Sequence, residues 1–269
     1  MTVLLQISDP HFGTEQPPVV EALVRLVQEQ QPDVLLLTGD ITQRATAAQF
    51  SAARAFVDRL RVPVVLAIPG NHDIPLFNLA ARLLWPYAGF KRAFGDNLTP
   101  TFESEAVLVL SVKTTRRWRH ADGQVSAAQI DRVAQRLLSA QSGRPGQWRI
   151  VLVHQPIAVT REQDRHNLLH GHAAAVRAWG AAGADMVVGG HIHLPFVLRL
   201  HDPALWVVQA GTAVSRRVRA DAGNSVNLIR IGAAAAVDSD RPPCQVERWD
   251  YRAGSLCFEQ ASIHPLRPV

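Results

Sequence analysis

Five short apolar segments, each followed closely by aspartate, asparagine or histidine, constrain the fold of this chain more than any other feature. A short apolar run that ends in polar residues or glycine is typical of a buried strand. The five segments are Val3–Ile7, Val34–Leu37, Val64–Ile68, Ile150–Val153 and Met186–Val188. Because ligands in open α/β sheets bind beyond the carboxyl ends of the strands, the sequence predicts one shared site at that edge.

The polar side chains at these strand ends are the candidate site residues. A single aspartate or histidine after a strand is usually a capping or loop residue, but five successive clusters are difficult to explain in that way. Glycines beside them allow the backbone to turn tightly, so that the next side chain points into the site; they are Gly39, Gly70, Gly189 and Gly190. The candidates are Asp9, His11, Asp40, Asn71, His72, Asp73, His154, His191 and His193.

These residue types indicate the class of metal. Carboxylates, an amide and several imidazoles suit Mn, Fe, Zn, Co or Ni, whereas Mg and Ca prefer shells made only of oxygen. The ligands exceed what one ion needs, and two ions that share a carboxylate are the economical solution. Two such ions, about 3.5–4 Å apart, can generate a hydroxide and hold both ends of an in-line displacement at phosphorus. We therefore expect two divalent transition-metal ions, with Mn, Fe or Zn favoured.

Helices and strands alternate in the first part of the chain only. Helices are predicted at Pro17–Gln30, from the capping box at Thr46 to about Leu60, from the capping box at Ser126 to about Ala140, and at Ala173–Ala182. A further strand is predicted at Val107–Val112. After Pro195 only strands are predicted, at Phe196–Leu200, Leu205–Val208, Val226–Ile231, Val246–Tyr251 and Leu256–Glu259. This order implies an α/β fold with two packed sheets and helices outside. We expect Ala233–Pro243 to be a flexible loop and the tail after Ile263 to be loosely held.

The order and spacing of the polar clusters closely resemble those of the calcineurin-like metallophosphoesterase family. The matching residues lie between about residues 3 and 195, and they are Asp9-Pro10-His11, Gly39-Asp40, Gly70-Asn71-His72-Asp73, His154 and Gly190-His191-Ile192-His193. The resemblance implies a metal-dependent phosphoric ester hydrolase with the two-sheet α-β-β-α sandwich of that family. We expect a single domain over residues 1–269, in which residues 1–195 carry the metal motifs and residues 196–269 complete the second sheet with strand hairpins.

The resemblance also implies a role for each site residue. The first metal would be held by Asp9, His11, Asp40 and His193, and the second by Asp40, Asn71, His154 and His191, so that Asp40 bridges the two. His72 would contact the phosphoryl group and protonate the leaving oxygen. Asp73 would orient His72, as carboxylates behind imidazoles commonly do.

Within the family, the chain is most similar to bacterial class III cyclic nucleotide phosphodiesterases and their glycerophosphodiesterase-like relatives. The Gly-Asn-His-Asp and Gly-His-Ile-His forms support this, as does Ala210-Gly211-Thr212-Ala213 before a predicted strand hairpin. One residue departs from the pattern, because many of these relatives carry a second histidine where this chain has Gln155.

Two arginine clusters and one apolar segment lie outside the metal motifs. The first cluster is Arg116, Arg117 and Arg119, with Lys113 nearby, and the second is Arg216, Arg217 and Arg219. Either cluster could bind a substrate phosphate, because the guanidinium fork matches phosphate oxygens, and a solvated basic loop is the alternative for both. Our candidates from them are Arg116, Arg117 and Arg216. The segment Leu76–Phe94 is rich in aromatic and aliphatic residues. It could be a cap over the metals, a contact with a membrane surface, or part of the core.

Composition narrows the setting and the substrate. The chain has 269 residues, a net charge of +5 and a pI near 10, which suits an anionic substrate. No apolar run approaches 20 residues, no signal peptide is evident, and the two cysteines form no disulfide framework, so we expect a cytoplasmic protein.

The favoured activity is hydrolysis of a small phosphodiester such as a 3′,5′-cyclic nucleotide. A nuclease or a hydrolase of nucleoside-diphosphate lipids is the alternative, and a non-catalytic scaffold on the same fold is the remote one. Nucleic acid is not favoured as a partner, because no separate DNA-binding domain is evident.

Overall fold

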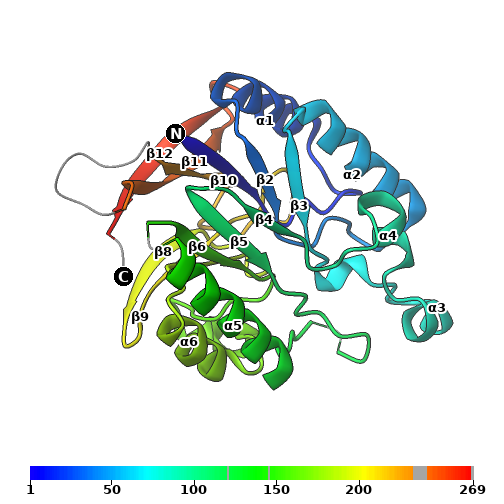
Figure 1. Cartoon of the computed structure of the whole chain (residues 1–269). Helices are drawn as coiled ribbons and strands as arrows, with labels where there is room; N and C mark the ends of the chain where they lie inside the picture. The colour runs from blue at the N-terminus through cyan, green and yellow to red at the C-terminus, as the bar shows by residue number, and fades with distance from the viewer. Residues whose placement is uncertain (120, 145, 233–240, 268–269) are drawn as a thin grey trace.

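The computed structural model describes residues 1–119, 121–144, 146–232 and 241–267. In these residues two six-stranded sheets pack face to face, with helices on both outer faces (Figure 1). The first sheet has the order β12-β11-β10-β1-β2-β3, with strands Cys257–Leu266, Cys244–Arg252, Ser225–Ile231, Thr2–Ile7, Val34–Leu37 and Val64–Ala67. The second has the order β4-β5-β6-β7-β9-β8, with strands Thr101–Glu103, Val107–Ser111, Trp148–Leu152, Met186–Gly189, Ala204–Gln209 and Phe196–His201.

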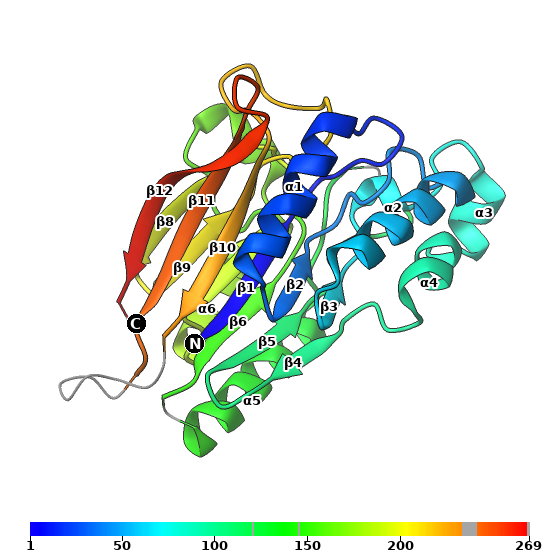
Figure 2. The same ribbon diagram turned by 90° about the horizontal axis from the view of Figure 1, so that it is seen from above.

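The helices form the two outer layers. Helices α1 (Pro17–Gln30) and α2 (Ala47–Leu60) cover the first sheet, and α5 (Ala127–Gly143) and α6 (His172–Ala181) cover the second (Figure 2). Short 3₁₀ helices span Asn71–Asp73 and Glu162–Asn167. The predicted α-β-β-α sandwich is therefore confirmed.

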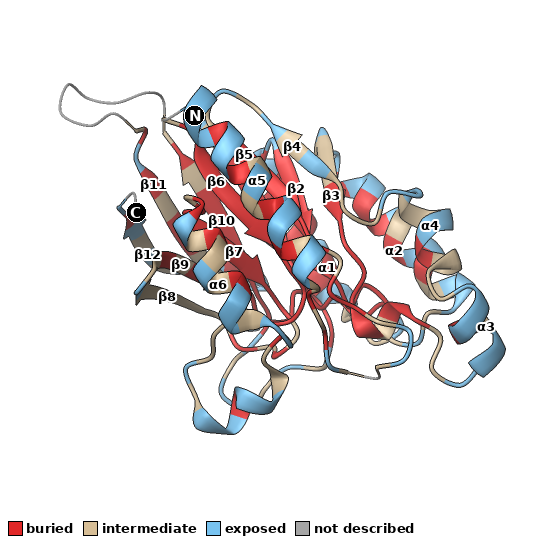
Figure 3. Cartoon of the chain, turned by 60° about the horizontal axis from the view of Figure 1, so that its bottom comes forward, coloured by how far each residue is buried: buried red, intermediate tan, exposed pale blue. Residues whose placement is uncertain are grey.

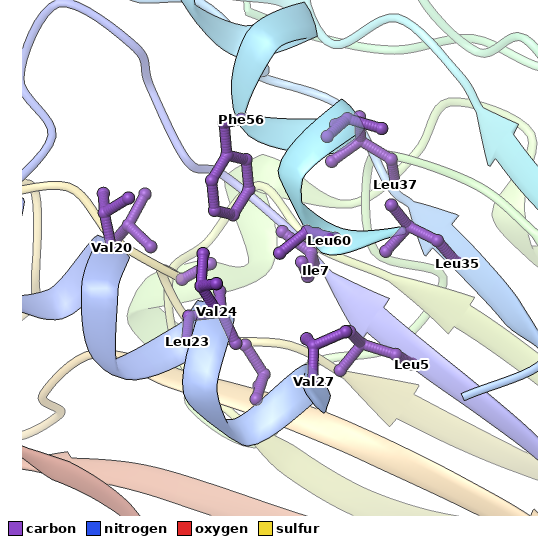
Figure 4. Packing of buried hydrophobic residues seen from close by; sticks show 14 of the residues in the cluster. Leu5, Ile7, Val20, Leu23, Val24, Val27, Leu35, Leu37, Phe56 and Leu60 are labelled. Atoms are coloured by element: carbon purple, nitrogen blue, oxygen red, sulfur yellow. The ribbon is translucent and has the colours of Figure 1, made fainter. Parts of the chain in front are cut away.

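The central strands β1, β2, β5, β6 and β7 are largely apolar because both of their faces are buried. On β1, Leu5 and Ile7 face α1 and α2, where they meet Leu23 and Phe56, whereas Leu4 faces the second sheet (Figure 4). Each fully buried side chain of this kind contributes about 1.5–3 kcal/mol relative to an exposed one. The outer helices are exposed on their far side, so their sequences show amphipathic spacing (Figure 3).

Both predicted capping boxes mark true helix starts. The Thr46 hydroxyl accepts a hydrogen bond from the Gln49 amide at 3.3 Å, and the Ser126 hydroxyl accepts one from the Gln129 amide at the same distance. Caps of this kind stabilise a helix by about 1 kcal/mol.

The strands after Pro195 do not all complete the second sheet. Strands β8 and β9 join it, but β10, β11 and β12 join the first sheet, with β10 antiparallel to β1. The tail is also more ordered than expected, since β12 stays paired with β11 as far as Leu266. Most of the expected loop Ala233–Pro243 lies outside the described residues.

The apolar segment after the third strand holds two short helices that the sequence did not predict, α3 (Leu79–Leu84) and α4 (Ala88–Phe94). Its side chains divide between two environments. Phe90 is fully buried in the core beneath α2, whereas Phe77, Leu84 and Trp85 are largely exposed on α3 and its flanks. No helix in the described part of the chain is both long and apolar enough to cross a membrane.

Candidate metal centre

The carboxyl ends of five strands from both sheets meet at one edge of the sandwich. Backbone hydrogen bonds join the turns within each sheet, from the Asp9 amide to the Gly39 carbonyl at 3.1 Å and from the Gly190 amide to the His154 carbonyl at 2.9 Å. The sheets are joined to each other by the His191 amide, which donates to Asp9 Oδ2 at 2.9 Å. All seven predicted metal-ligand residues are brought together here and are buried or largely buried.

The first group of potential ligands is Asp9, His11, Asp40 and His193, whose ligand atoms lie within 4.8 Å of one another. His193 Nε2 is 3.2 Å from Asp9 Oδ1, and His11 Nε2 is 3.8 Å from Asp40 Oδ2. The ring nitrogens of His11 and His193 approach to 3.1 Å. Converging nitrogens and carboxylate oxygens of this kind suit a shared cation.

The second group is Asp40, His154 and His191, with Asn71 beside it. His154 Nε2 lies 3.3 Å from Asp40 Oδ1 and 3.3 Å from Asn71 Oδ1. Asp40 thus turns one carboxylate oxygen toward each group, which is the placement a bridging ligand requires.

Two buried atoms support the fit of a metal pair to these residues. Asp9 Oδ1 and His191 Nδ1 are buried and have no hydrogen-bond partner among the described residues. An unpaired buried polar atom is costly unless it binds something else. With nitrogen and oxygen donors on every side, the two groups are positioned to bind two metal ions.

Two of the imidazoles, those of His154 and His193, are held in an orientation and tautomer that suit metal binding. His154 Nδ1 donates to the Thr38 carbonyl at 2.8 Å, and His193 Nδ1 donates to the Arg217 carbonyl at 2.5 Å. These bonds leave Nε2 of each ring free to face the site. The Asp40 carboxylate is fixed in turn by the His72 amide, which donates to Oδ1 at 2.8 Å.

Burial and the neighbouring carboxylates act in opposite directions on the pKa values of the site histidines. Burial lowers the pKa of His11 to about 3 and that of His191 to about 4, so both rings are neutral near pH 7. Burial also disfavours the charged form of His154, but the Asp40 carboxylate outweighs it and raises the pKa of His154 to about 9. Bound cations would oppose that proton, because a ligand nitrogen must be unprotonated.

The ligand turns have an unusual backbone. Asp9, His11, Asp40, His191 and His193 all have positive φ, between 42° and 76°, a region that side chains with a Cβ seldom adopt. Strained conformations of this kind collect at functional sites. Gly190 is needed for a different reason, because it lets the two sheets approach closely. A Cβ at this position would lie 1.8 Å from Ser8 Oγ and 2.5 Å from Asp9 Oδ2.

His72 lies at the rim of the two groups but is not oriented by Asp73. Its Nδ1 donates to the Gln43 carbonyl at 3.0 Å, and its ring meets that of His11 edge to face. The Asp73 carboxylate instead accepts from the amides of Gly70, Ile41 and Thr42 at 2.8–3.0 Å. Asp73 therefore fixes the turn that carries Asn71 and His72, and the expected contact with the ring is wrong.

Among the described residues, the arginine that contacts the site histidines is Arg217 of the second cluster, rather than the selected Arg216. Arg217 Nη1 lies 2.9 Å from His72 Nε2, 3.4 Å from His11 Nδ1 and 3.2 Å from Gln43 Oε1. Because the guanidinium can only donate, His72 Nε2 accepts here. The neighbouring Arg216 is exposed to solvent.

The other two selected arginines are engaged elsewhere. Arg116 donates to the carbonyls of Lys113 and Thr115 and to Gln129, and Arg117 donates to the Leu83 carbonyl at 2.6 Å. Gln155, at the position of the family's second histidine, is also turned toward this loop, where it bonds Thr114 and the Ala121 carbonyl. These side chains stabilise the loop, and within the described residues none of them forms a hydrogen bond with a proposed metal-ligand side chain.

Comparison with known proteins agrees with this arrangement. The family model for calcineurin-like phosphoesterases matches residues 2–195. A probable cyclic nucleotide phosphodiesterase from Synechococcus is 26% identical over 206 residues, which cover 72% of this chain and 74% of that protein.

Solved structures share the fold at low sequence identity. A dimetal phosphatase from Danio rerio has a TM-score of 0.70 at 11% identity, covering 100% of this chain and 99% of that one. A purple acid phosphatase from yellow lupin has a TM-score of 0.67 at 11% identity, covering 93% of this chain and 51% of that one. A Vps29 from Entamoeba histolytica has a TM-score of 0.53 at 12% identity, covering 99% of this chain and 100% of that one.

Proposed function

Since this chain belongs to the calcineurin-like phosphoesterase family, and is thus a metal-dependent phosphoric ester hydrolase with two metal ions, we propose that its substrate is a small phosphodiester such as a 3′,5′-cyclic nucleotide. The observation that carries the proposal is the single guanidinium of Arg217 between the metal groups and His72. A diester has one negative charge and a monoester nearly two. One fixed cation beside two metal sites suits the smaller charge, and the relative named for cyclic nucleotides supports the same class.

We assign the ligands as the resemblance implies. Asp9, His11, Asp40 and His193 would hold the first ion, and Asp40, Asn71, His154 and His191 the second. When bound, the pair would activate a water as nucleophile and neutralise charge on the phosphoryl oxygens.

The other residues bind substrate and move a proton. A phosphoryl oxygen that accepts the Arg217 hydrogen bond would take that donor away from His72 Nε2. The Gln43 carbonyl would continue to hold Nδ1–H. Nε2 would then be free to take up a proton from water and pass it to the departing alkoxide. General acid assistance of this kind contributes about 10²–10⁴-fold.

One observation favours a second substrate class. The exposed apolar side chains of α3 follow the Asn71-His72 turn closely in sequence, and Leu76, just before α3, lines a small pocket together with Asn71 and His72. A nucleoside-diphosphate lipid would use both features, so it belongs in any substrate comparison. The scaffold alternative has no such support, because every proposed ligand residue is present.

A substrate panel with the manganese-loaded enzyme tests the proposal. It should contain bis-p-nitrophenyl phosphate, p-nitrophenyl phosphate, cyclic AMP, single-stranded DNA and a nucleoside-diphosphate lipid, with the Asp40→Asn variant as the blank for contaminating activity. We expect the bis ester to be hydrolysed faster than the monoester, and cyclic AMP to be cleaved. A strong preference for the monoester, or activity confined to the lipid, would overturn the assignment.

A further inference from the structure

Large apolar side chains are exposed together on one protruding part of the molecule. The most exposed of them come from two segments, residues 76–85 around α3 and residues 116–119, which we call the aromatic lip. Helix α3 stands out from the body and is largely exposed (Figure 3). The exposed apolar residues of the lip are Phe77, Leu79, Leu83, Leu84, Trp85 and Trp118, each with more than half of its surface accessible. A soluble surface seldom concentrates so much apolar area without a partner.

The two segments of the lip are fastened to each other. The buried side chain of Arg82 donates to the Arg119 carbonyl at 2.5 Å and to the Pro75 carbonyl at 3.2 Å. In the opposite direction, Arg117 donates to the Leu83 carbonyl at 2.6 Å. Burying a charged guanidinium is costly unless it is hydrogen-bonded. Here its bonds go to backbone carbonyls of both segments, so they hold the two segments in a fixed arrangement. The apolar side chains are therefore displayed on a supported surface.

The lip and its flanks are strongly basic. Residues 74–94 and 113–119 contain seven of the chain's 28 basic side chains and none of its 23 acidic ones, so the rest of the chain, with 21 basic and 23 acidic side chains, has a net charge of about −2. Two of the seven pair with carboxylates just outside these segments, Lys91 with Asp96 at 3.5 Å and Arg119 with Asp122 at 3.6 Å. The Arg44 guanidinium lies 5.3 Å from the Phe77 ring centre, and that of Arg117 lies 5.9 Å from the Trp118 ring centre. In the described part of the chain, neither arginine pairs with a carboxylate.

We propose that the aromatic lip docks on an anionic phospholipid bilayer and so presents the metal centre to the membrane surface. Tryptophan and phenylalanine favour the headgroup boundary, aliphatic side chains enter below it, and arginines above them meet lipid phosphates. The aliphatic residues Leu79, Leu83 and Leu84 distinguish this surface from one for single-stranded nucleic acid, which uses basic grooves and aromatic stacking. The proposal does not depend on which phosphoester the enzyme cleaves.

Vesicle flotation of the full chain tests the docking. Vesicles of phosphatidylcholine with about one third phosphatidylglycerol should carry the protein upward, and pure phosphatidylcholine should carry much less. The Trp85→Ser/Trp118→Ser variant should lose about tenfold or more of the bound protein, because both removed rings lie on the lip. Its rate with bis-p-nitrophenyl phosphate should stay at the wild-type level, which shows that the fold is intact.

A matched control removes exposed apolar side chains elsewhere. Leu138 and Ile263 are about half exposed and lie outside the lip, so Leu138→Ser/Ile263→Ser should float as the wild type does. The proposal would be overturned if the wild-type protein floated with neither kind of vesicle. It would also be overturned if the control variant lost as much vesicle binding as the tryptophan variant. Binding of a single-stranded oligonucleotide that needs Trp85 and Trp118, without vesicle binding, would assign the lip to nucleic acid instead.

Discussion

Replacing Arg217 with alanine should separate substrate binding from metal binding. Among the described residues, its side chain is the one cation within hydrogen-bond reach of His72, whereas its backbone carbonyl accepts from His193 Nδ1 at 2.5 Å. Alanine removes the first contact and keeps the second. We therefore expect Arg217→Ala to retain both metal ions and the fold while it loses affinity for the phosphoryl group.

The size of the loss follows from the bonds removed. A hydrogen bond to a charged group contributes about 1.5–3 kcal/mol, and each 1.36 kcal/mol corresponds to a factor of ten. One such bond to a phosphoryl oxygen predicts that kcat/KM falls about 10- to 150-fold with bis-p-nitrophenyl phosphate. Arg217→Lys should recover only part of this, because an ammonium lacks the planar fork.

The assay compares steady-state rates and metal content for two neighbouring substitutions. Arg216→Ala removes the same charge from an exposed position one residue away, so its kcat/KM should stay within about twofold of the wild type. Equal losses in the two variants would mean that only the overall charge matters. A metal-depleted Arg217→Ala protein would show that the side chain supports the site rather than the substrate.

Three further outcomes are expected. Elemental analysis of the active protein should find two transition-metal ions per chain, and Asp40→Asn should lower occupancy at both positions; one ion in a fully active sample would refute the shared carboxylate. His72→Ala should keep both ions and lose about 10²–10⁴-fold in kcat with cyclic AMP but less with a p-nitrophenyl ester, whose leaving group needs little protonation; equal losses would exclude an acid role. Gly190→Ala should reduce metal content and destabilise the fold by about 1–3 kcal/mol, because the new Cβ would collide with Ser8 and Asp9. Gly254→Ala, where a Cβ meets nothing within 4 Å, is its control, and a similar effect there would refute the steric argument.

The features that were best predicted from the sequence are those determined by residues close together in the chain. The helix starts at Thr46 and Ser126 follow from a side chain that bonds an amide three residues on, so they need no knowledge of the rest of the fold. The ends of the central strands could be predicted because the apolar run that is buried on both faces of the sheet stops there. Sheet membership is different, because it depends on partners far away in the chain. The length of β12 was underestimated because the strand alternates exposed and less exposed residues at an edge and includes Pro265.

The same distinction between local and distant interactions applies to the residues of the site. The gathering of the proposed ligand residues at one place could be predicted because each follows a buried strand, and the strand fixes where the next residues go. Arg216 and Arg217 lie in an irregular loop, where neighbouring side chains point in different directions. That loop is held by Asn224, which donates to the carbonyls of Thr212 and Ser215. No periodic pattern indicates which of the two arginines turns inward.

The pairing of β1 with β10 has a consequence for the order in which the protein can form. Thr2 lies opposite Ile231 and Gln6 opposite Asn227, so the first strand made is flanked on one side by a strand made near the end. Gln6 joins three distant parts of the chain, since it accepts from Asn227 at 2.8 Å and donates to the Gly189 carbonyl at 2.8 Å. Pairings so remote in sequence form slowly.

Until β10 is synthesised, β1 is an apolar edge strand with open hydrogen-bonding groups, which is a template for aggregation. A fragment that ends at residue 195, where the family match ends, would contain all seven proposed metal ligands. It would lack both the neighbour of β1 and the arginine over the site. The strands after residue 195 thus cover the open edge of β1 and complete the sheet that carries part of the site.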